Sequence, residues 1–190
     1  MGLILSSIGI VLLLPIFLLI AIVIKIESRG PVFYLQKRYG KDGKWSNMIK
    51  FRTMHANAEQ LKKNLIHLKE VDGPMFKISN DPRITKLGRI LRSTSIDELP
   101  QLFNVFKGEM SLVGPRPLIT DEMKFSPTWR DIRLSVKPGM TGLWQVEARS
   151  SHSFQDWIKY DVDYVKNRSL WLDIKILLQT MKVVLKREGT

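Results

Sequence analysis

The chain has 190 residues, and 30 lysine and arginine residues against 18 aspartate and glutamate residues give a formal net charge of +12. This length has room for one domain, and a 44% share of hydrophobic residues excludes a chain that is disordered throughout. The lack of cysteine excludes disulfides, thiolate zinc sites, iron–sulfur clusters and a cysteine nucleophile. The three histidines form no HExxH-like group, so only a hard cation held by carboxylates stays open as a metal.

The N-terminal segment is apolar from Leu3 to Ile24 and contains no charged residue. About 20 such residues cover the hydrocarbon core of a bilayer, so we expect the segment to enter a membrane. No basic residue precedes it and no small-x-small site follows before Lys25, which disfavours a cleaved signal peptide. The basic residues that follow, from Lys25 and Arg29 onward, favour a cytoplasmic location for the rest of the chain.

Pro15 lies in the middle of this apolar segment, where its ring removes one helical hydrogen bond and clashes with the carbonyl group of Val11. A kink is therefore expected. Two topologies fit it: a bent helix that crosses the bilayer, which is the commoner case in general, and a helix–break–helix that dips in and returns to the same face.

The remaining patterns predict an α+β fold that is mainly helical. Turn signals at Gly30-Pro31 and Asp42-Gly43 bracket short strands around residues 32–35 and 48–49. Apolar spacing predicts helices over 54–70, 97–106, 153–167 and 170–186, with loops and short pieces between 107 and 150. The buried stripe expected for the second of these helices is Leu99, Leu102, Phe103 and Phe106. The last helix fits either a membrane interface or a core position.

Asp97 and Glu98 are the acids that most suggest chemistry. Ser95 and Glu98 have the spacing of a capping box, whereas Pro100 favours Asp97 as the N-cap, and both readings put the two acids at a helix N-terminus. That position stabilises carboxylates and attracts phosphate. Asp97 is thus a candidate nucleophile toward phosphorus, and Glu98 a candidate magnesium ligand beside it. The alternative is that both acids only stabilise the helix start.

Several basic residues flank loop-forming residues and are candidates to converge on a diphosphate. Arginine forks and the lysine point charge are the groups that phosphate recognition uses, although each residue alone is more simply a solvated surface charge. The candidates are Lys50, Arg52, Arg89, Arg92, Arg116 and Arg149.

Asp161-Val162-Asp163 is a weak match to the Asp-x-Asp metal motif of nucleotide-sugar glycosyltransferases. Residues two apart on a helix face different directions, which disfavours a shared metal. Asp173 is most simply an acid favoured at a helix start, and the sequence leaves the roles of these three acids open.

An ordered set of motifs covers almost the whole chain. It comprises the apolar start with its proline, Lys50-Phe51-Arg52-Thr53-Met54, Arg92 to Gln101, Ser111 to Leu118, Lys137 to Gly142 and Trp171-Leu172-Asp173. In this set the chain resembles the monotopic phosphoglycosyl transferases, also called bacterial sugar transferases.

The resemblance implies an enzyme of the bacterial plasma membrane, catalytic on its cytoplasmic face. Such an enzyme transfers a sugar 1-phosphate from a UDP-sugar to undecaprenyl phosphate with Mg²⁺, releases UMP and starts a surface glycan such as an exopolysaccharide. It implies Asp97 as the nucleophile of a covalent phosphosugar intermediate, Glu98 as its partner at the metal, and Lys50, Arg92, Arg116 and Arg149 as phosphate-binding residues. Asp97 and Glu98 are both expected near the metal.

The resemblance also implies a monotopic, membrane-associated architecture. Residues 1–26 would form a re-entrant helix broken at Pro15, so the resemblance favours this topology over the crossing helix that is commoner in general. Residues 27–190 would form a cytoplasmic catalytic domain with interfacial amphipathic helices. Expected partners are the UDP-sugar donor, undecaprenyl phosphate and membrane lipids, with no nucleic acid. The identity of the sugar stays open, and so does the oligomeric state, for which a homodimer is one possibility. The choice between a minimal enzyme and the catalytic part of a longer chain is open as well.

Two rival functions remain. A membrane-anchored basic module that binds anionic lipid or nucleic acid without catalysis would fit the charge of +12. A direct glycosyltransferase would release UDP in place of UMP.

Overall fold

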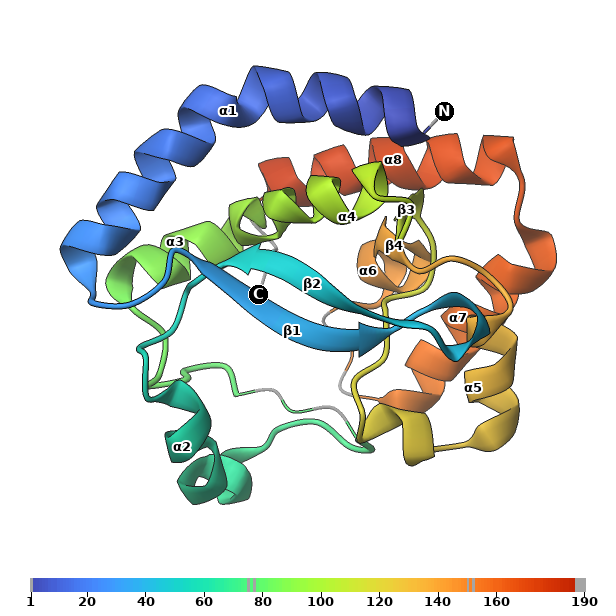
Figure 1. Cartoon of the computed structure of the whole chain (residues 1–190). Helices are drawn as coiled ribbons and strands as arrows, with labels where there is room; N and C mark the ends of the chain where they lie inside the picture. The colour runs from blue at the N-terminus through green and yellow to red at the C-terminus, as the bar shows by residue number, and fades with distance from the viewer. Residues whose placement is uncertain (1, 75, 77, 150, 152, 187–190) are drawn as a thin grey trace.

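The structure is a computed structural model that describes residues 2–74, 76, 78–149, 151 and 153–186. It is mainly helical with two small sheets, as predicted (Figure 1). Met1 and residues 187–190, which belong to the two predicted segments 1–26 and 27–190, lie outside the described residues. The α-helices are α1 (Gly2–Glu27), α2 (Ala58–Lys62), α3 (Lys86–Ser93), α4 (Leu102–Phe106), α5 (Pro127–Leu134), α6 (Leu143–Glu147), α7 (Phe154–Asn167) and α8 (Leu170–Leu185). The 3-10 helices are η1 (Lys41–Gly43), η2 (Lys63–Leu68), η3 (Ile96–Gln101) and η4 (Glu122–Lys124).

Two strand pairs form the sheets. β1 (Phe33–Tyr39) and β2 (Trp45–Phe51) form an antiparallel hairpin, in which Phe33 lies opposite Phe51. This confirms the two predicted strands and lengthens both. Asp42, with a φ of 57°, turns the chain between them, as the Asp-Gly signal predicts. β3 (Ser111–Val113) and β4 (Gly139–Thr141) pair in parallel.

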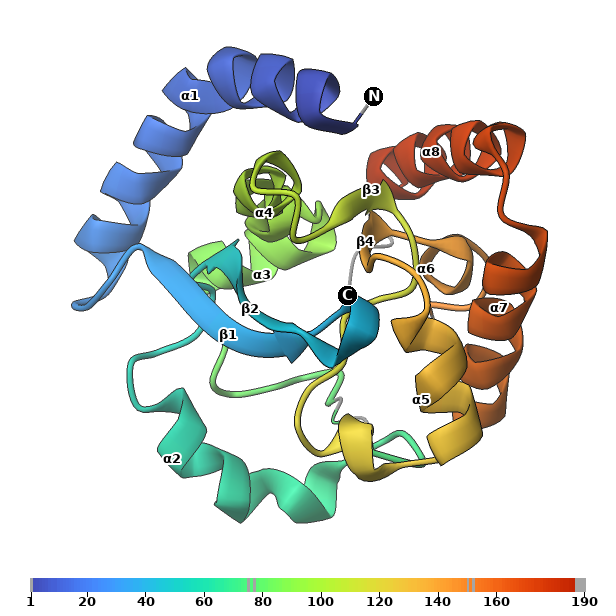
Figure 2. The same ribbon diagram turned by 45° about the vertical axis from the view of Figure 1, so that its right-hand side comes forward.

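Helix α1 runs without interruption through Pro15. The predicted break is therefore wrong for this structure: the ribbon of α1 bends between its two halves but stays helical (Figure 2). A proline removes one hydrogen bond and its steric clash is relieved by bending, so the rest of the helical hydrogen-bond ladder can persist.

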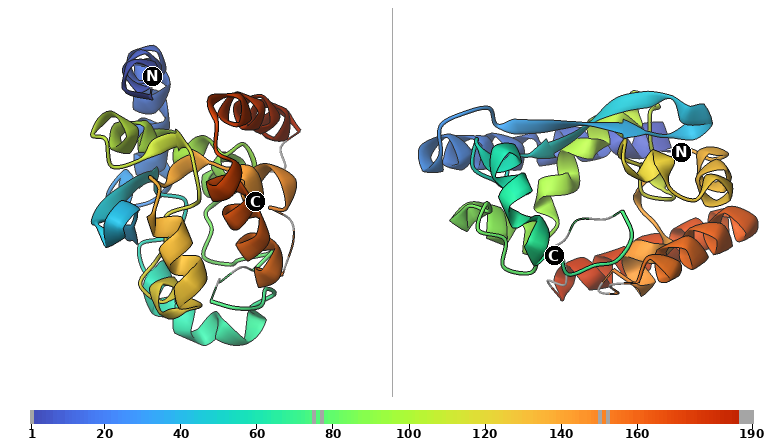
Figure 3. Two further views of the ribbon diagram at one scale, coloured as in Figure 1. Left: turned by 90° about the vertical axis from the view of Figure 1, so that its right-hand side faces the viewer. Right: turned by 90° about the horizontal axis from the view of Figure 1, so that it is seen from below.

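Both halves of α1 contact the rest of the molecule. In the first half Ser6 is fully buried, and a Cβ atom placed on Gly9 would lie 3.2 Å from Leu102 of α4. In the second half the Phe17 ring lies 5.5 Å from that of Phe51, centroid to centroid. Within the described part of the chain, α1 is the one helix long and apolar enough to cross a membrane. It lies at the same end of the molecule as α8 (Figures 1 and 3).

Other helices depart from the sequence prediction. The helix expected over 54–70 shrinks to α2 and η2, because Met54 forms a β-bridge with Ile84. Helices α3 and α5 were not predicted, since eight residues are too few to show a clear apolar period. Phe106, expected in a buried stripe, is 49% exposed at the end of α4.

Helices α7 and α8 begin where predicted, and Ser153 and Ser169 cap them by accepting hydrogen bonds from backbone N–H groups. They play different parts. Helix α7 is a core helix, because its fully buried Trp157 packs among the aromatic side chains of α5 and α6. Helix α8 instead exposes the large apolar side chains of Leu170, Trp171, Leu178, Met181 and Leu185.

Candidate functional site

One cavity brings together four of the six predicted site residues. Lys50, Glu98, Arg116 and Arg149 all line it. Its other lining residues, none of which was a predicted site residue, are Met48, Gln101, Pro117, Gly139, Met140 and Gln145. The structure therefore brings Lys50, Arg116 and Arg149, which are distant in the sequence, to one cavity, and their binding of a diphosphate stays a prediction.

Strand β2 presents Lys50 to the cavity, and Asn104 of α4 holds the strand there. The fully buried Asn104 side chain accepts a hydrogen bond from the backbone N–H of Ile49 at 3.0 Å and donates one to the carbonyl of Asn47 at 2.8 Å. Because the carboxamide bonds the backbone on the N-terminal side of Lys50, it fixes where that side chain starts. Nothing in the sequence marked Asn104 for this task.

Parallel pairing of β3 with β4 brings the Arg116 loop to the cavity. A Cβ atom on Gly139 would lie 2.1 Å from the backbone nitrogen of Gly114, and one on Gly114 would lie 2.6 Å from the carbonyl oxygen of Lys137. Only glycine permits this approach of two backbones. The glycines of the two motifs thus let the segments around Arg116 and Met140 meet.

Asp97 and Glu98, the dyad, lie in η3. This helix begins at Ile96, directly after Ser95, which has a left-handed φ of 56°. Asp97 and Glu98 therefore do lie in the first turn of a helix, as predicted. Ser95 is the N-cap residue, as the capping-box alternative expects, and Asp97 is not; the capping box itself is not formed, because Ser95 makes no side-chain cap bond. Its hydroxyl instead accepts a hydrogen bond from Arg149 at 3.1 Å, and the Glu98 carboxylate pairs with Lys50.

Glu98 is held as a carboxylate by the cations around it. Its Oε1 atom lies 2.6 Å from Nζ of Lys50. Burial would raise the pKa of Glu98, but Lys50, Arg116 and Arg149 together lower it to about 2. Glu98 is thus ionised at neutral pH.

The pKa of Asp97 is shifted in the opposite direction. Its side chain is buried, and this burial raises the pKa of its carboxyl group above the usual aspartate range, with a further rise from the charge of Glu98. Lys50, Arg92 and Arg149 act against the rise. Two adjacent carboxyl groups with pKa values moved apart are typical of groups with different chemical tasks.

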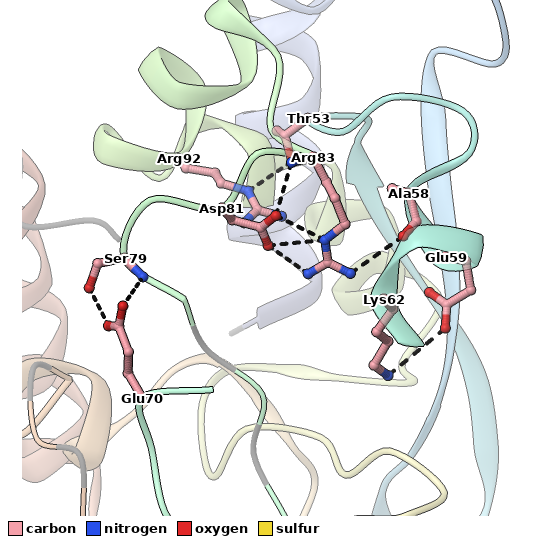
Figure 4. A network of polar contacts seen from close by, with 9 residues as sticks. All are labelled: Thr53, Ala58, Glu59, Lys62, Glu70, Ser79, Asp81, Arg83 and Arg92. Atoms are coloured by element: carbon pink, nitrogen blue, oxygen red, sulfur yellow. Dashed lines mark hydrogen bonds and ion pairs between the residues drawn. The ribbon is translucent and has the colours of Figure 1, made fainter. Parts of the chain in front are cut away.

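Arg92 lies outside the cavity lining. Its guanidinium donates a hydrogen bond to the hydroxyl of Thr53 at 2.9 Å and stands beside the Asp81–Arg83 ion pair (Figure 4). Its charge nevertheless acts on Asp97. Arg92 therefore belongs to the surroundings of Asp97 and not to the cavity lining.

The Asp-x-Asp match does not form part of the cavity. Asp161 is buried in the aromatic core, where its Oδ2 atom lies 3.1 Å from Nε of Arg133. Asp173 accepts a hydrogen bond from the hydroxyl of Tyr164 at 2.9 Å. Asp161 and Asp173 thus both have structural partners, and neither lines the cavity.

A dedicated metal cage is absent from the described residues, which contain no group of three or more metal-ligating side chains. Mg²⁺ is commonly held by one or two carboxylates together with substrate phosphates. The Oε2 atom of Glu98 has no hydrogen-bond partner among the described residues, and Asp97 is its neighbour in sequence. The dyad therefore fits a magnesium ion that is completed by a diphosphate.

Comparison with known proteins identifies the family. The family model described as "Bacterial sugar transferase" matches residues 1–187. The chain belongs to the bacterial sugar transferases. The family resemblance drawn from the motifs is thereby confirmed.

Similar members of this family carry informative names. The undecaprenyl-phosphate galactose phosphotransferase of Salmonella typhimurium is 48% identical over 168 residues, which are 84% of this chain and 34% of the relative. The UDP-glucose:undecaprenyl-phosphate glucose-1-phosphate transferase of Klebsiella pneumoniae is 40% identical over 189 residues, 94% of this chain and 38% of the relative. The exopolysaccharide production protein ExoY of Rhizobium meliloti is 37% identical, covering 97% of this chain and 84% of the relative. The chain thus spans little more than a third of the first two relatives.

The electrostatics of this bacterial sugar transferase predict how its activity responds to pH. If ionised Asp97 is the reactive form, the rate falls as pH drops through its raised pKa. Lys50→Met removes a charge that lowers this pKa, so the acid limb of kcat/KM should move to higher pH. Glu98→Gln removes a charge that raises it, so the limb should move to lower pH. Shifts of both variants in the same direction would contradict the assignment of the limb to Asp97.

Proposed function

We propose that this chain transfers a sugar 1-phosphate from a UDP-sugar to undecaprenyl phosphate. Support comes from the carboxyl dyad: Glu98, held ionised, lines a cavity with Lys50, Arg116 and Arg149, and its buried neighbour Asp97, which is not itself a lining residue, interacts with the charges of Lys50 and Arg149. Relatives named for this reaction with galactose and glucose also support it. The transfer would release UMP and would begin the synthesis of a surface polysaccharide.

In the first step, a carboxylate oxygen of Asp97 attacks the phosphorus that bears the sugar. A new O–P bond forms, the bond between this phosphorus and the bridging oxygen of the diphosphate breaks, and UMP leaves with that electron pair. Arg116 and Arg149 bind the phosphate oxygens, because guanidinium groups fit them in a bidentate manner. Lys50 holds Glu98 in place and adds a positive charge.

In the second step, a phosphate oxygen of undecaprenyl phosphate attacks the same phosphorus. The acyl phosphate bond breaks and the Asp97 carboxylate is regenerated. The product is a lipid-linked sugar diphosphate. Two displacements let one cavity serve a soluble donor and a membrane-bound acceptor in turn.

Glu98, through its ionised carboxylate, would hold Mg²⁺ together with Asp97 and the donor diphosphate. The ion would offset the negative charge that grows on the diphosphate during transfer.

The topology of α1 belongs to the same proposal. Both halves of α1 pack against one domain, and α8 exposes its apolar side chains at the same end of the molecule (Figure 3). This arrangement supports a bent helix that enters the membrane and returns, and the basic residues after Ile24 favour the cytoplasmic face for the domain. Single cysteines introduced before Leu3 and after Lys25 should react with impermeant reagents from the same side of the membrane. Labelling from opposite sides would refute the re-entrant helix.

Released nucleotide distinguishes this proposal from its rivals. The full chain with Mg²⁺, undecaprenyl phosphate and a panel of UDP-sugars should release UMP with at least one donor. A direct glycosyltransferase would release UDP, and a non-catalytic basic module would release neither. The same panel would identify the donor sugar.

A further inference from the structure

The loop that carries Arg116 has few donors of its own. In Gly114-Pro115-Arg116-Pro117, the two prolines lack an N–H group, so the loop cannot hold itself by an ordinary pattern of backbone bonds. Three successive carbonyls instead accept hydrogen bonds from elsewhere. The carbonyl of Pro115 accepts from the backbone N–H of Gly139 at 2.9 Å, that of Arg116 accepts from Arg133, and that of Pro117 accepts from Arg38 at 3.0 Å.

Arg133 is itself held between two aromatic rings and a carboxylate. It is 3% exposed, and its guanidinium carbon lies 4.5 Å from the ring centroid of Trp129 and 4.6 Å from that of Trp157. Its Nε atom lies 3.1 Å from the Asp161 carboxylate. A buried guanidinium between two aromatic faces with a carboxylate partner has little freedom to move. Its bond to the Arg116 carbonyl therefore transmits the rigidity of the core to the loop.

Arg38 performs the equivalent task from β1. It is 5% exposed, donates two hydrogen bonds to the side chain of Gln36 and lies 3.7 Å from the carboxylate of Glu122. That carboxylate also accepts a hydrogen bond from the backbone N–H of Ile119 at 2.8 Å, just beyond the loop. Glu122 thus holds both the Arg38 guanidinium and the backbone just after the loop.

Neither arginine lines the cavity. Burying a cation is costly unless it is paired, and here two paired cations, Arg38 and Arg133, are buried close to a third, Arg116. Burial, followed by the charge of Arg116, lowers the pKa of Arg38 to about 9. The charge of Arg116 also lowers the pKa of Arg133, whose shift burial dominates. An anion bound by Arg116 would relieve this mutual repulsion.

We propose that Arg38 and Arg133, together called the arginine clamp, are positioning residues that hold Arg116 against the cavity for a nucleoside diphosphate. This inference rests on the proposed function. The clamp acts through the backbone of Arg116 and does not touch the substrate.

A double-mutant cycle on UDP affinity tests the clamp, with calorimetry on the full chain in detergent. Arg133→Lys keeps the charge, but a single ammonium group cannot reproduce the guanidinium group, which pairs with Asp161 through one nitrogen and donates to the Arg116 carbonyl through another. It should weaken UDP binding about tenfold, because Arg116 loses its fixed position. The same change in an Arg116→Ala background should cost less than about twofold. In turnover, KM for the donor should rise while kcat stays within about threefold.

Arg130→Lys, at a half-buried position on α5 outside the cavity lining, is the matched control and should leave UDP affinity unchanged. Arg38→Lys repeats the cycle from β1 if Arg133→Lys does not fold, as judged by thermal unfolding. Equal losses with and without Arg116 would overturn the clamp and leave the transferase proposal standing. A non-additive cycle without any UMP release would overturn the transferase proposal alone, and absence of UDP binding by the unchanged chain would overturn both.

Discussion

Asp97→Asn should reduce the rate of UMP release by about four orders of magnitude, because the amide cannot form an acyl phosphate. The exchange keeps the size of the side chain, and the carboxyl group that it replaces is already disfavoured as an ion by burial. The variant should therefore fold as well as the original chain, and UDP affinity should change little. UMP release with saturating donor and acceptor measures the loss.

Asp131→Asn is the control for this experiment. Asp131 lies on the surface, where it pairs with Arg130, so the same chemical change there should leave the rate unchanged. A substantial rate in the Asp97 variant, with the control behaving as expected, would remove Asp97 as the nucleophile.

Glu98→Gln should lower kcat about 100-fold and raise the magnesium concentration needed for half-maximal rate. The amide oxygen can still accept a hydrogen bond from Lys50, which lies 2.6 Å from the present carboxylate, so the local geometry should persist. What disappears is the negative charge that the surrounding cations maintain at a pKa of about 2. A magnesium titration of UMP release measures the effect.

Glu59→Gln serves as the matched variant, because Glu59 is an exposed acid paired with Lys62 on α2. Its magnesium titration should match that of the original chain. A Glu98 variant with an unchanged magnesium requirement would contradict the role of Glu98 at the metal, even if its kcat fell.

The sequence was informative where a local pattern carries the physical cause. Turn residues located the β1–β2 hairpin, and apolar spacing located α7 and α8. Loop-forming motifs marked Arg116 and Arg149, and both residues reach the cavity. Charged residues beside glycine and proline turns are good candidates for binding residues, because a few turn residues set the local backbone conformation.

The sequence was uninformative where tertiary contacts decide the outcome. The supposed capping box failed because Lys50, far away in the chain, offers Glu98 a stronger partner than the backbone of Ser95. The support of the Arg116 loop was missed for a similar reason. Arg38 lies in an ordinary strand and Arg133 in a short helix, and only the fold shows that both bond adjacent carbonyls.

The central claim is that the Asp97 carboxylate becomes covalently attached to the sugar-phosphoryl group of the donor. Intact-mass and peptide analysis of enzyme mixed with a productive UDP-sugar, Mg²⁺ and no lipid acceptor tests it directly. The account predicts a mass increase equal to one sugar phosphate on the peptide that contains Asp97, and its loss when undecaprenyl phosphate is added. An enzyme that turns over the same donor but never carries this adduct would contradict the account.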